Sequence, residues 1–238
     1  MYHSGSTVEA LTPLTELDLD VKTGFCPDLI VEVTSICDRA CSGCYANNII
    51  SSKSKLETLQ KFPNLFVDPA ALNISMAKLE IYPTTVSFRG GEPTRHPLLN
   101  QIIKETFELT GAQLYLETHG RWLIESPDPD LVDTLNETKS TVKISFDKMH
   151  EIGVESLRAM TKCLDSNGVQ FVVAITEEDS PTFMDTRVKC NWVPDSKIIF
   201  QKKTKKISEL PSPPIGVINC AGILTKSLNT KAGYRGER

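Results

Sequence analysis

The sequence predicts an α/β protein whose fold is a partial barrel of six βα units. Short runs rich in β-branched residues alternate with segments whose apolar residues recur at helical spacing, which favours a parallel sheet with helical crossovers. The chain has 238 residues, whereas a closed eight-fold barrel typically takes about 250. Because only six units can be counted, an open barrel fits the sequence better than a closed one.

Six segments are expected to form the strands of this sheet. They are residues 29–33, 84–88, 113–116, 141–146, 169–175 and 197–200. In each of them Val, Ile, Leu, Thr or an aromatic residue predominates, as is typical of strands. Because helices are expected between them, the strands should run parallel to one another.

Four helices are expected between these strands. Asp68 and Pro69 suit the N-cap and first position of one helix, and Gly111 suits the end of another. A short helix is expected over residues 130–135, and a longer one ends at Asn167 and Gly168. The apolar residues with helical spacing are Leu72, Met76 and Leu79, then Leu99, Ile103 and Phe107, then Val154, Leu157, Met160 and Leu164.

Composition and patterning divide the chain into three parts and exclude some functions. Residues 1–25 read as a polar N-terminal arm, residues 26–207 as the core, and residues 208–238 as a tail that is a candidate lid. The 26 basic and 30 acidic side chains give a net charge of −4, so neither a nucleic acid nor an anionic membrane is an expected partner. The longest apolar run, Phe171 to Ile175, is too short to span a bilayer. No secretory signal is recognisable, so a cytoplasmic location is expected.

Seven cysteines are present, and three of them, Cys37, Cys41 and Cys44, fall within eight residues. In a reducing compartment such a cluster indicates metal binding or redox chemistry more than cross-linking. Three thiolates on one loop can hold three irons of a four-iron cluster and leave the fourth iron open. A zinc site completed by Cys26 or a histidine, and ordinary buried thiols, are the alternatives.

Two motifs together resemble the radical S-adenosylmethionine (SAM) superfamily. A Cys-x3-Cys-x2-Cys loop follows the first expected strand, a Gly-Gly-Glu-Pro run follows the second, and the similarity spans residues 28–202. The resemblance implies a [4Fe–4S] cluster, held by Cys37, Cys41 and Cys44. It also implies bound SAM, whose methionine amino group would lie at Gly90, Gly91, Glu92 and Pro93. The glycines would let the backbone approach the ligand closely.

Further positions are similar to SAM contacts of that superfamily. Glu117 and Thr118 begin a run that resembles its acidic-Thr-Asn-Gly sequence, with His119 in place of Asn. The others are Ser145 and Asp147 at the end of the fourth strand, and Tyr45, which would partly replace the aromatic residue expected at position 43. Each of these residues also suits an ordinary cap or turn.

The resemblance implies reductive cleavage of SAM to a 5′-deoxyadenosyl radical that abstracts hydrogen from a small-molecule or peptide substrate. An electron donor such as flavodoxin or ferredoxin would be needed. The tail contains Cys220 but too few cysteines for a complete auxiliary-cluster domain. Two alternatives stay open: an activase that installs a glycyl radical on a partner enzyme, and a non-catalytic zinc or iron–sulfur binding module.

Overall fold

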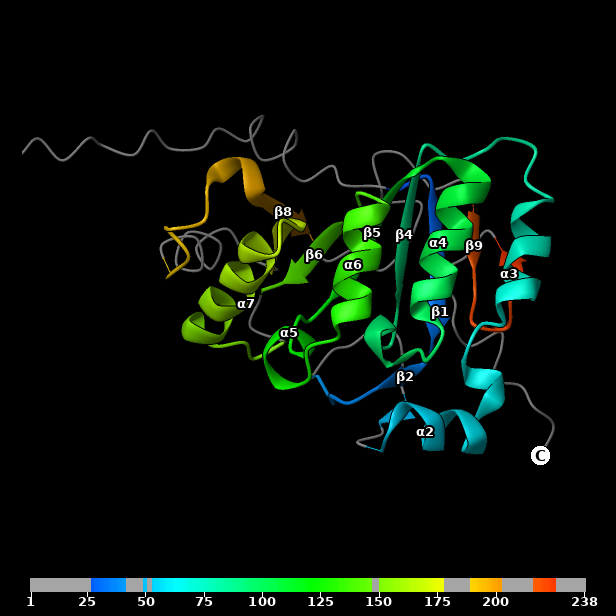
Figure 1. Ribbon diagram of the computed structural model, residues 1–238, viewed down its shortest axis with the longest axis horizontal. Coiled ribbons are helices and arrows are strands. Elements are labelled where there is room, and N and C mark those ends of the chain that lie inside the picture. The colour runs from blue at the N-terminus through cyan, green and yellow to red at the C-terminus, as the bar shows by residue number, and fades with distance from the viewer. Residues whose placement is uncertain are drawn as a thin grey trace, which may run out of the picture.

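A parallel sheet with helices on one face forms the body of the protein (Figure 1). The computed structural model describes residues 27–41, 49–50, 53–146, 150–177, 189–202 and 216–225. The strands of the large sheet are β1 (Leu29–Thr34), β4 (Thr85–Gly90), β5 (Gln113–Thr118), β6 (Thr141–Ser145), β7 (Gln170–Glu177), β8 (Ile198–Lys202), β9 (Gly216–Ile218) and β10 (Leu224–Thr225). Their order is β10-β9-β1-β4-β5-β6-β7-β8.

The six strands expected from the sequence form, and they follow one another across the sheet in chain order. All five pairings from β1 to β8 are parallel, as crossover connections require. This confirms the α/β class and agrees with a partial barrel. A seventh parallel strand, β9, pairs with the outer edge of β1, and β10 pairs antiparallel with β9. These two were not expected, because three and two residues are too few to show a period.

The four expected helices also form, with local signals at their ends. They are α3 (Pro69–Met76), α4 (Leu99–Thr110), α6 (Pro129–Glu137) and α7 (Val154–Ser166). The Asp68 carboxylate accepts a hydrogen bond from the Ala71 N–H at 3.0 Å, which caps α3. Gly111 adopts a left-handed conformation (φ 63°) after α4, where a glycine costs least.

Two α-helices of the described residues were not predicted from the sequence. They are α2 (Lys55–Lys61) and α5 (Trp122–Glu125). The first begins with a capping box in which Ser54 and Glu57 bond to each other's backbone, and Ser-x-x-Glu is a sequence signal that could have revealed it. The second is a single turn of four residues, too short to show helical spacing.

The hydrophobic core lies between the sheet and its helices. Figure 1 shows α4, α6 and α7 on the same side of the strands. Alternate residues of each strand point to that side, and they are the buried apolar ones: Leu29, Val31 and Val33 in β1, Val86 and Phe88 in β4, Leu114 and Leu116 in β5, and Val142 and Ile144 in β6. The intervening positions point to the opposite face, which no helix of the described residues covers.

Some of the expected parts of the chain fall outside the described residues. The N-terminal arm, residues 1–25, is one of them, and most of the tail is another. Residues 216–225 of the tail extend the sheet beside β1, while its role as a lid stays a prediction. Among the described residues no helix is both long and apolar enough to cross a membrane.

Candidate functional site

Three of the sequence motifs meet at one edge of the sheet. The chain leaves β1 at Thr34 and reaches Cys37 through the short strand β2 (Ile36–Cys37), which pairs with β3 (Ile49–Ile50). The strands β1, β4 and β5 are neighbours and parallel, so their carboxyl ends lie together. This edge of a parallel sheet is where α/β proteins bind ligands.

The glycines after β4 pack directly against the backbone that leads to the cysteine loop. The Gly91 N–H donates to the Thr34 carbonyl at 2.7 Å, and the Glu92 N–H donates to the Ile36 carbonyl at 2.8 Å. A Cβ on Gly90 would overlap with the Thr34 carbonyl oxygen, and one on Gly91 would overlap with the Ile36 carbonyl oxygen. The close approach expected for a ligand is therefore made by the protein itself, and the ligand contact stays a prediction.

The Glu92 carboxylate joins the Gly-Gly-Glu-Pro run to the end of β5. Its Oε1 accepts hydrogen bonds from the Thr94 N–H (3.2 Å), the Thr94 hydroxyl (2.7 Å) and the Thr118 hydroxyl (2.7 Å). Its Oε2 accepts from the His119 N–H at 3.1 Å. The side chain is buried, and Pro93 begins the 3-10 turn Pro93–Arg95 beside it. These contacts make Glu92 and Thr118 a fixed part of the site.

His119 connects the same end of β5 to the cysteine loop. Its Nε2 lies 2.9 Å from Asp38 Oδ1 and 3.2 Å from Glu92 Oε2, while its Nδ1 accepts from the Arg121 N–H at 3.2 Å. Burial disfavours the charged ring, but the carboxylates of Glu92 and Asp38 outweigh it and raise the pKa of His119. The imidazole therefore acts as a donor that ties Asp38, and with it Cys37, to Glu92.

Two of the three clustered cysteines are described, and neither forms a disulfide. Cys37 is buried, and its Sγ accepts from the Arg39 N–H at 3.4 Å. Burial raises the pKa of Cys37 to about 12, although the Arg39 N–H opposes this, and Glu92, Asp38 and Cys41 raise it further. A metal must displace the thiol proton, because only the thiolate is a ligand. Cys44, Tyr45 and Asp147 lie outside the described residues.

A mononuclear metal could also find ligands here. Cys37, Asp38 and His119 offer one ligand atom each, and these three atoms lie within 4.8 Å of one another. The sequence analysis considered a histidine as a fourth zinc ligand but did not identify which one. His119 is that candidate, and its position is set by contacts between segments 81 residues apart.

Glu117, an expected SAM contact, binds side chains of the neighbouring strands. Its Oε2 lies 3.1 Å from Lys143 Nζ, and its Oε1 accepts from the Ser87 hydroxyl at 2.5 Å. Burial would raise the pKa of Glu117, but Lys143, Arg89 and the Ser87 hydrogen bond lower it to about 2. Ser145 ends β6 at the edge that holds the cysteine loop and is half-buried. Contacts of these residues with SAM stay predictions.

The sequence analysis missed the charged residues inside the strands. Lys143 lies in the middle of β6 and Glu32 in the middle of β1, each flanked by apolar residues. A charged residue between apolar residues in a strand is a signal that the two faces of the strand differ, with the charge on the face away from the apolar core. Arg89, beside Gly90, belongs to the same face.

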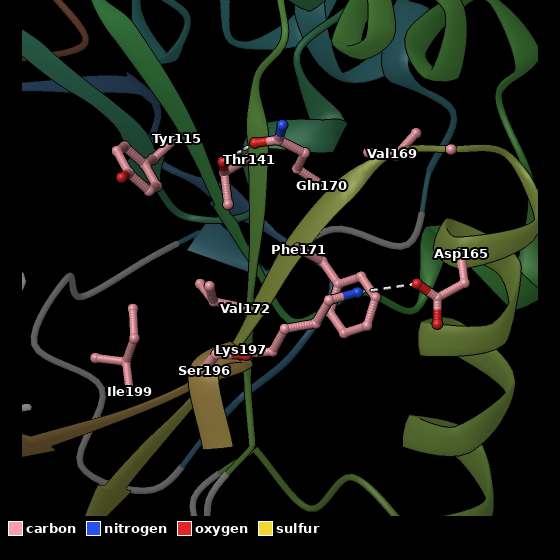
Figure 2. A pocket seen from close by; sticks show the side chains of 11 residues that line it. Tyr115, Thr141, Asp165, Val169, Gln170, Phe171, Val172, Ser196, Lys197 and Ile199 are labelled. Carbon is pink, nitrogen blue, oxygen red and sulfur yellow. Dashed lines mark hydrogen bonds and ion pairs between the residues drawn. The ribbon is translucent and has the colours of Figure 1, made fainter. Parts of the chain in front are cut away.

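A separate pocket of about 420 Å³ lies at the opposite end of the strands (Figure 2). Its lining includes Tyr115 from β5, Thr141 at the start of β6 and Gln170 at the start of β7. The Lys197 ammonium beside it is paired with Asp165 at 2.9 Å. Because the cysteine loop follows the carboxyl ends of the strands, this pocket is not part of the candidate site.

No family model matches the sequence, and no curated protein matches it. The fold, by contrast, is similar to solved radical SAM enzymes. Coproporphyrinogen III oxidase (HemN) from Escherichia coli, described as a radical SAM enzyme, has a TM-score of 0.50 at 13% identity, covering 77% of this chain and 45% of its own. The protein anSMEcpe with bound AdoMet has a TM-score of 0.50 at 15% identity, covering 73% and 51%.

These comparisons establish the fold. The chain shares the fold of these radical SAM enzymes, in agreement with the resemblance of its two motifs. It spans about half the length of the solved structures it matches. The activity, substrate and partners of those longer proteins are therefore matters of proposal for this chain.

The first prediction concerns the packing of Gly91. Gly91→Ala should destabilise the protein by about 1–3 kcal/mol, as overpacking does, because the added Cβ would overlap with the Ile36 carbonyl oxygen. Urea denaturation measures the free energy of unfolding. The control is Gly153→Ala, whose Cβ would meet only the Ser156 hydroxyl at 3.9 Å. Equal stability of the two variants would contradict the prediction.

The second prediction concerns acid stability. The pKa of Glu117 falls from its usual 4.5 to about 2 in the folded protein. The ionised Glu117 carboxylate therefore adds about 3 kcal/mol to the free energy of unfolding above pH 4.5. This stabilisation is lost as the pH falls toward 2. Urea denaturation at pH 6, 4 and 3 should show a smaller loss in the double variant Glu117→Gln/Lys143→Met than in the wild type.

The control for this experiment is an exposed ion pair. Lys104 and Glu137 lie 2.7 Å apart with side chains 44% and 61% exposed, and such pairs contribute little. The double variant Glu137→Gln/Lys104→Met should lose stability with acid as the wild type does. If Glu117→Gln/Lys143→Met also loses as much stability with acid as the wild type, the buried pair is not the cause of the acid sensitivity.

Proposed function

We propose that this chain is a radical SAM enzyme that holds one [4Fe–4S] cluster with Cys37, Cys41 and Cys44 and binds SAM beside it. The observation that carries the proposal is the meeting of the cysteine loop, the Gly-Gly-Glu-Pro run and the Glu117–Gly120 run at one sheet edge, in a chain with this fold. The reduced cluster, when bound, supplies the electron that cleaves SAM. Hydrogen abstraction from a small-molecule or peptide substrate would follow.

The protein's own residues prepare this site for a cluster. Cys37 lies buried at the end of the first strand, where iron would replace its thiol proton. Cys41 is close enough to Cys37 to influence the pKa of that thiol. Asp38 and His119 hold the loop against Glu92, which is the kind of supporting contact that orients metal ligands.

The Gly-Gly-Glu-Pro run is suited to bind the methionine amino group of SAM. The N–H groups of Gly91 and Glu92 are already used by the carbonyls of Thr34 and Ile36. The backbone groups that this run can offer a ligand are therefore carbonyl oxygens, which accept hydrogen bonds from an ammonium. An oxygen-sensitive cluster also needs a reducing compartment and a reductant, so we include a cytoplasmic location and a flavodoxin or ferredoxin donor in the proposal.

The third prediction is the direct test of this function. After anaerobic reconstitution the protein should contain iron and sulfide in equal amounts, and dithionite with SAM should yield 5′-deoxyadenosine, measured by chromatography. Cys41→Ala should lower the yield to background, because it removes one of three thiolate ligands. Cys163→Ala, a half-buried cysteine on α7, is the matched control and should retain the activity. A fully reconstituted wild type that forms no 5′-deoxyadenosine would contradict the proposal.

A second candidate function is a non-catalytic zinc module, which the proximity of Cys37, Asp38 and His119 favours. His119→Asn distinguishes the two, and this is the fourth prediction. For a cluster held by three thiolates, this variant should keep the iron and sulfide content of the wild type in metal and sulfide analysis. One tightly bound zinc per wild-type chain, without sulfide and lost in His119→Asn, would favour the zinc module instead.

A further inference from the structure

The face of the sheet away from the helices carries a row of alternating charges. Figure 1 shows the helices α4, α6 and α7 on one side of the strands, and the core residues point to that side. The positions between them point the other way. Four of these positions hold charged side chains: Glu32 on β1, Arg89 on β4, Glu117 on β5 and Lys143 on β6.

Strand register places these four residues side by side. Glu32 pairs with Arg89 across β1 and β4, and Glu117 pairs with Lys143 across β5 and β6. Phe88 pairs with Leu116, so the next residues, Arg89 and Glu117, are neighbours too. The charges therefore run negative, positive, negative, positive across four adjacent strands.

Glu117 and Lys143 of this row form a buried ion pair. Glu117 binds Lys143 at 3.1 Å and the Ser87 hydroxyl at 2.5 Å. Arg89 is also close enough to lower the pKa of Glu117. A buried ion pair with additional hydrogen bonds accounts for these residues as part of the fold.

The burial of Glu32 is not explained by an ion pair with additional hydrogen bonds of this kind. Its side chain is 2% exposed, and in the described part of the chain its Oε1 has no hydrogen-bond partner. Burial raises the pKa of Glu32 to about 7, although the charge of Arg89 opposes this. A buried carboxylate oxygen without a hydrogen bond is costly.

Glu32 also lies next to the candidate site. Two residues after it, the Thr34 carbonyl accepts the Gly91 N–H, and five residues after it comes Cys37. Ser35 is in hydrogen-bond contact with the Cys220 thiol at 3.2 Å, and the charge of Glu32 contributes to raising the pKa of that thiol. The Glu32 carboxylate thus lies on β1, near the end of the strand from which the chain enters the cysteine loop.

We propose that Glu32 anchors the substrate, and that the substrate presents a cationic nitrogen, such as a primary amine, to its carboxylate. This inference rests on the proposed function. An ionised carboxylate only accepts hydrogen bonds, so the matching group must be a donor. A charged N–H donor makes the strongest such bond and compensates the buried charge. Glu117 cannot take this role because Lys143 and Ser87 already engage it.

The test uses n-butylamine as a probe and n-butyramide as its neutral counterpart. Each is added to the reconstituted full chain with SAM at pH 8, and the thermal unfolding temperature is measured. The amine should raise it by about 2–4 °C at roughly ten times its dissociation constant, and the amide should not. The rise should disappear in Glu32→Gln and persist in Glu108→Gln, an exposed carboxylate on α4.

In this binding experiment the inference is overturned by no rise in the wild type, or by a rise that persists in Glu32→Gln. 5′-Deoxyadenosine formation in the same preparation reports the proposed function separately. SAM cleavage without the amine effect contradicts the role of Glu32 alone. The amine effect without SAM cleavage contradicts the proposed function and leaves an amine-binding carboxylate.

The destabilising effect of the buried Glu32 carboxylate can be measured separately. Since the folded pKa lies above the usual value of 4.5, ionisation of Glu32 lowers the stability as the pH rises from 4.5 through 7. Two ionisable groups interact electrostatically with Glu32: Arg89 from β4, and Cys220 from the turn between β9 and β10. Glu32→Gln should therefore raise the unfolding temperature at pH 8 and change it little below pH 5. A lower unfolding temperature at pH 8 would overturn the inference.

Discussion

The carboxylate of Glu92 is the interaction on which the candidate site depends. It accepts hydrogen bonds from Thr94, Thr118 and the His119 backbone, while the His119 ring reaches Asp38 beside Cys37. One side chain thus joins the ends of β4 and β5 to the cysteine loop. The glycines just before it can pack against the loop backbone only because they lack a Cβ. Close packing and a saturated carboxylate together hold the expected cluster ligand in place before any metal binds.

The two faces of the sheet have different physical roles. The helix-covered face buries an apolar core, which supplies the stability. The other face carries charged residues in register across four strands, and two of them, Glu117 and Lys143, form an ion pair. Glu32 differs from Glu117, since its buried Oε1 has no hydrogen-bond partner in the described part of the chain, whereas Glu117 contacts Lys143 and Ser87. A fold stabilised on one side can tolerate such a group on the other side.

The sequence alone predicted the repeating part of this fold and that the motifs of the candidate site follow neighbouring strands, but not the contacts between them. The strands and helices from Leu29 to Lys202 follow from apolar spacing and cap residues such as Asp68 and Gly111. The strand β9 was missed because its place beside β1 depends on contacts distant in sequence. For the same reason the sequence suggested a ligand as the neighbour of Gly91, whereas the structure shows Ile36. His119 was recognised as a departure from the superfamily pattern, and only the fold brings it to Asp38.

The central claim is that three thiolates leave one iron of a cluster open for SAM. Mössbauer spectroscopy of the reconstituted protein, before and after addition of SAM, tests this most directly. The account predicts that one iron in four changes its isomer shift when SAM binds, because only that iron lacks a protein ligand. A spectrum that SAM leaves unchanged, with four equivalent irons, would contradict it.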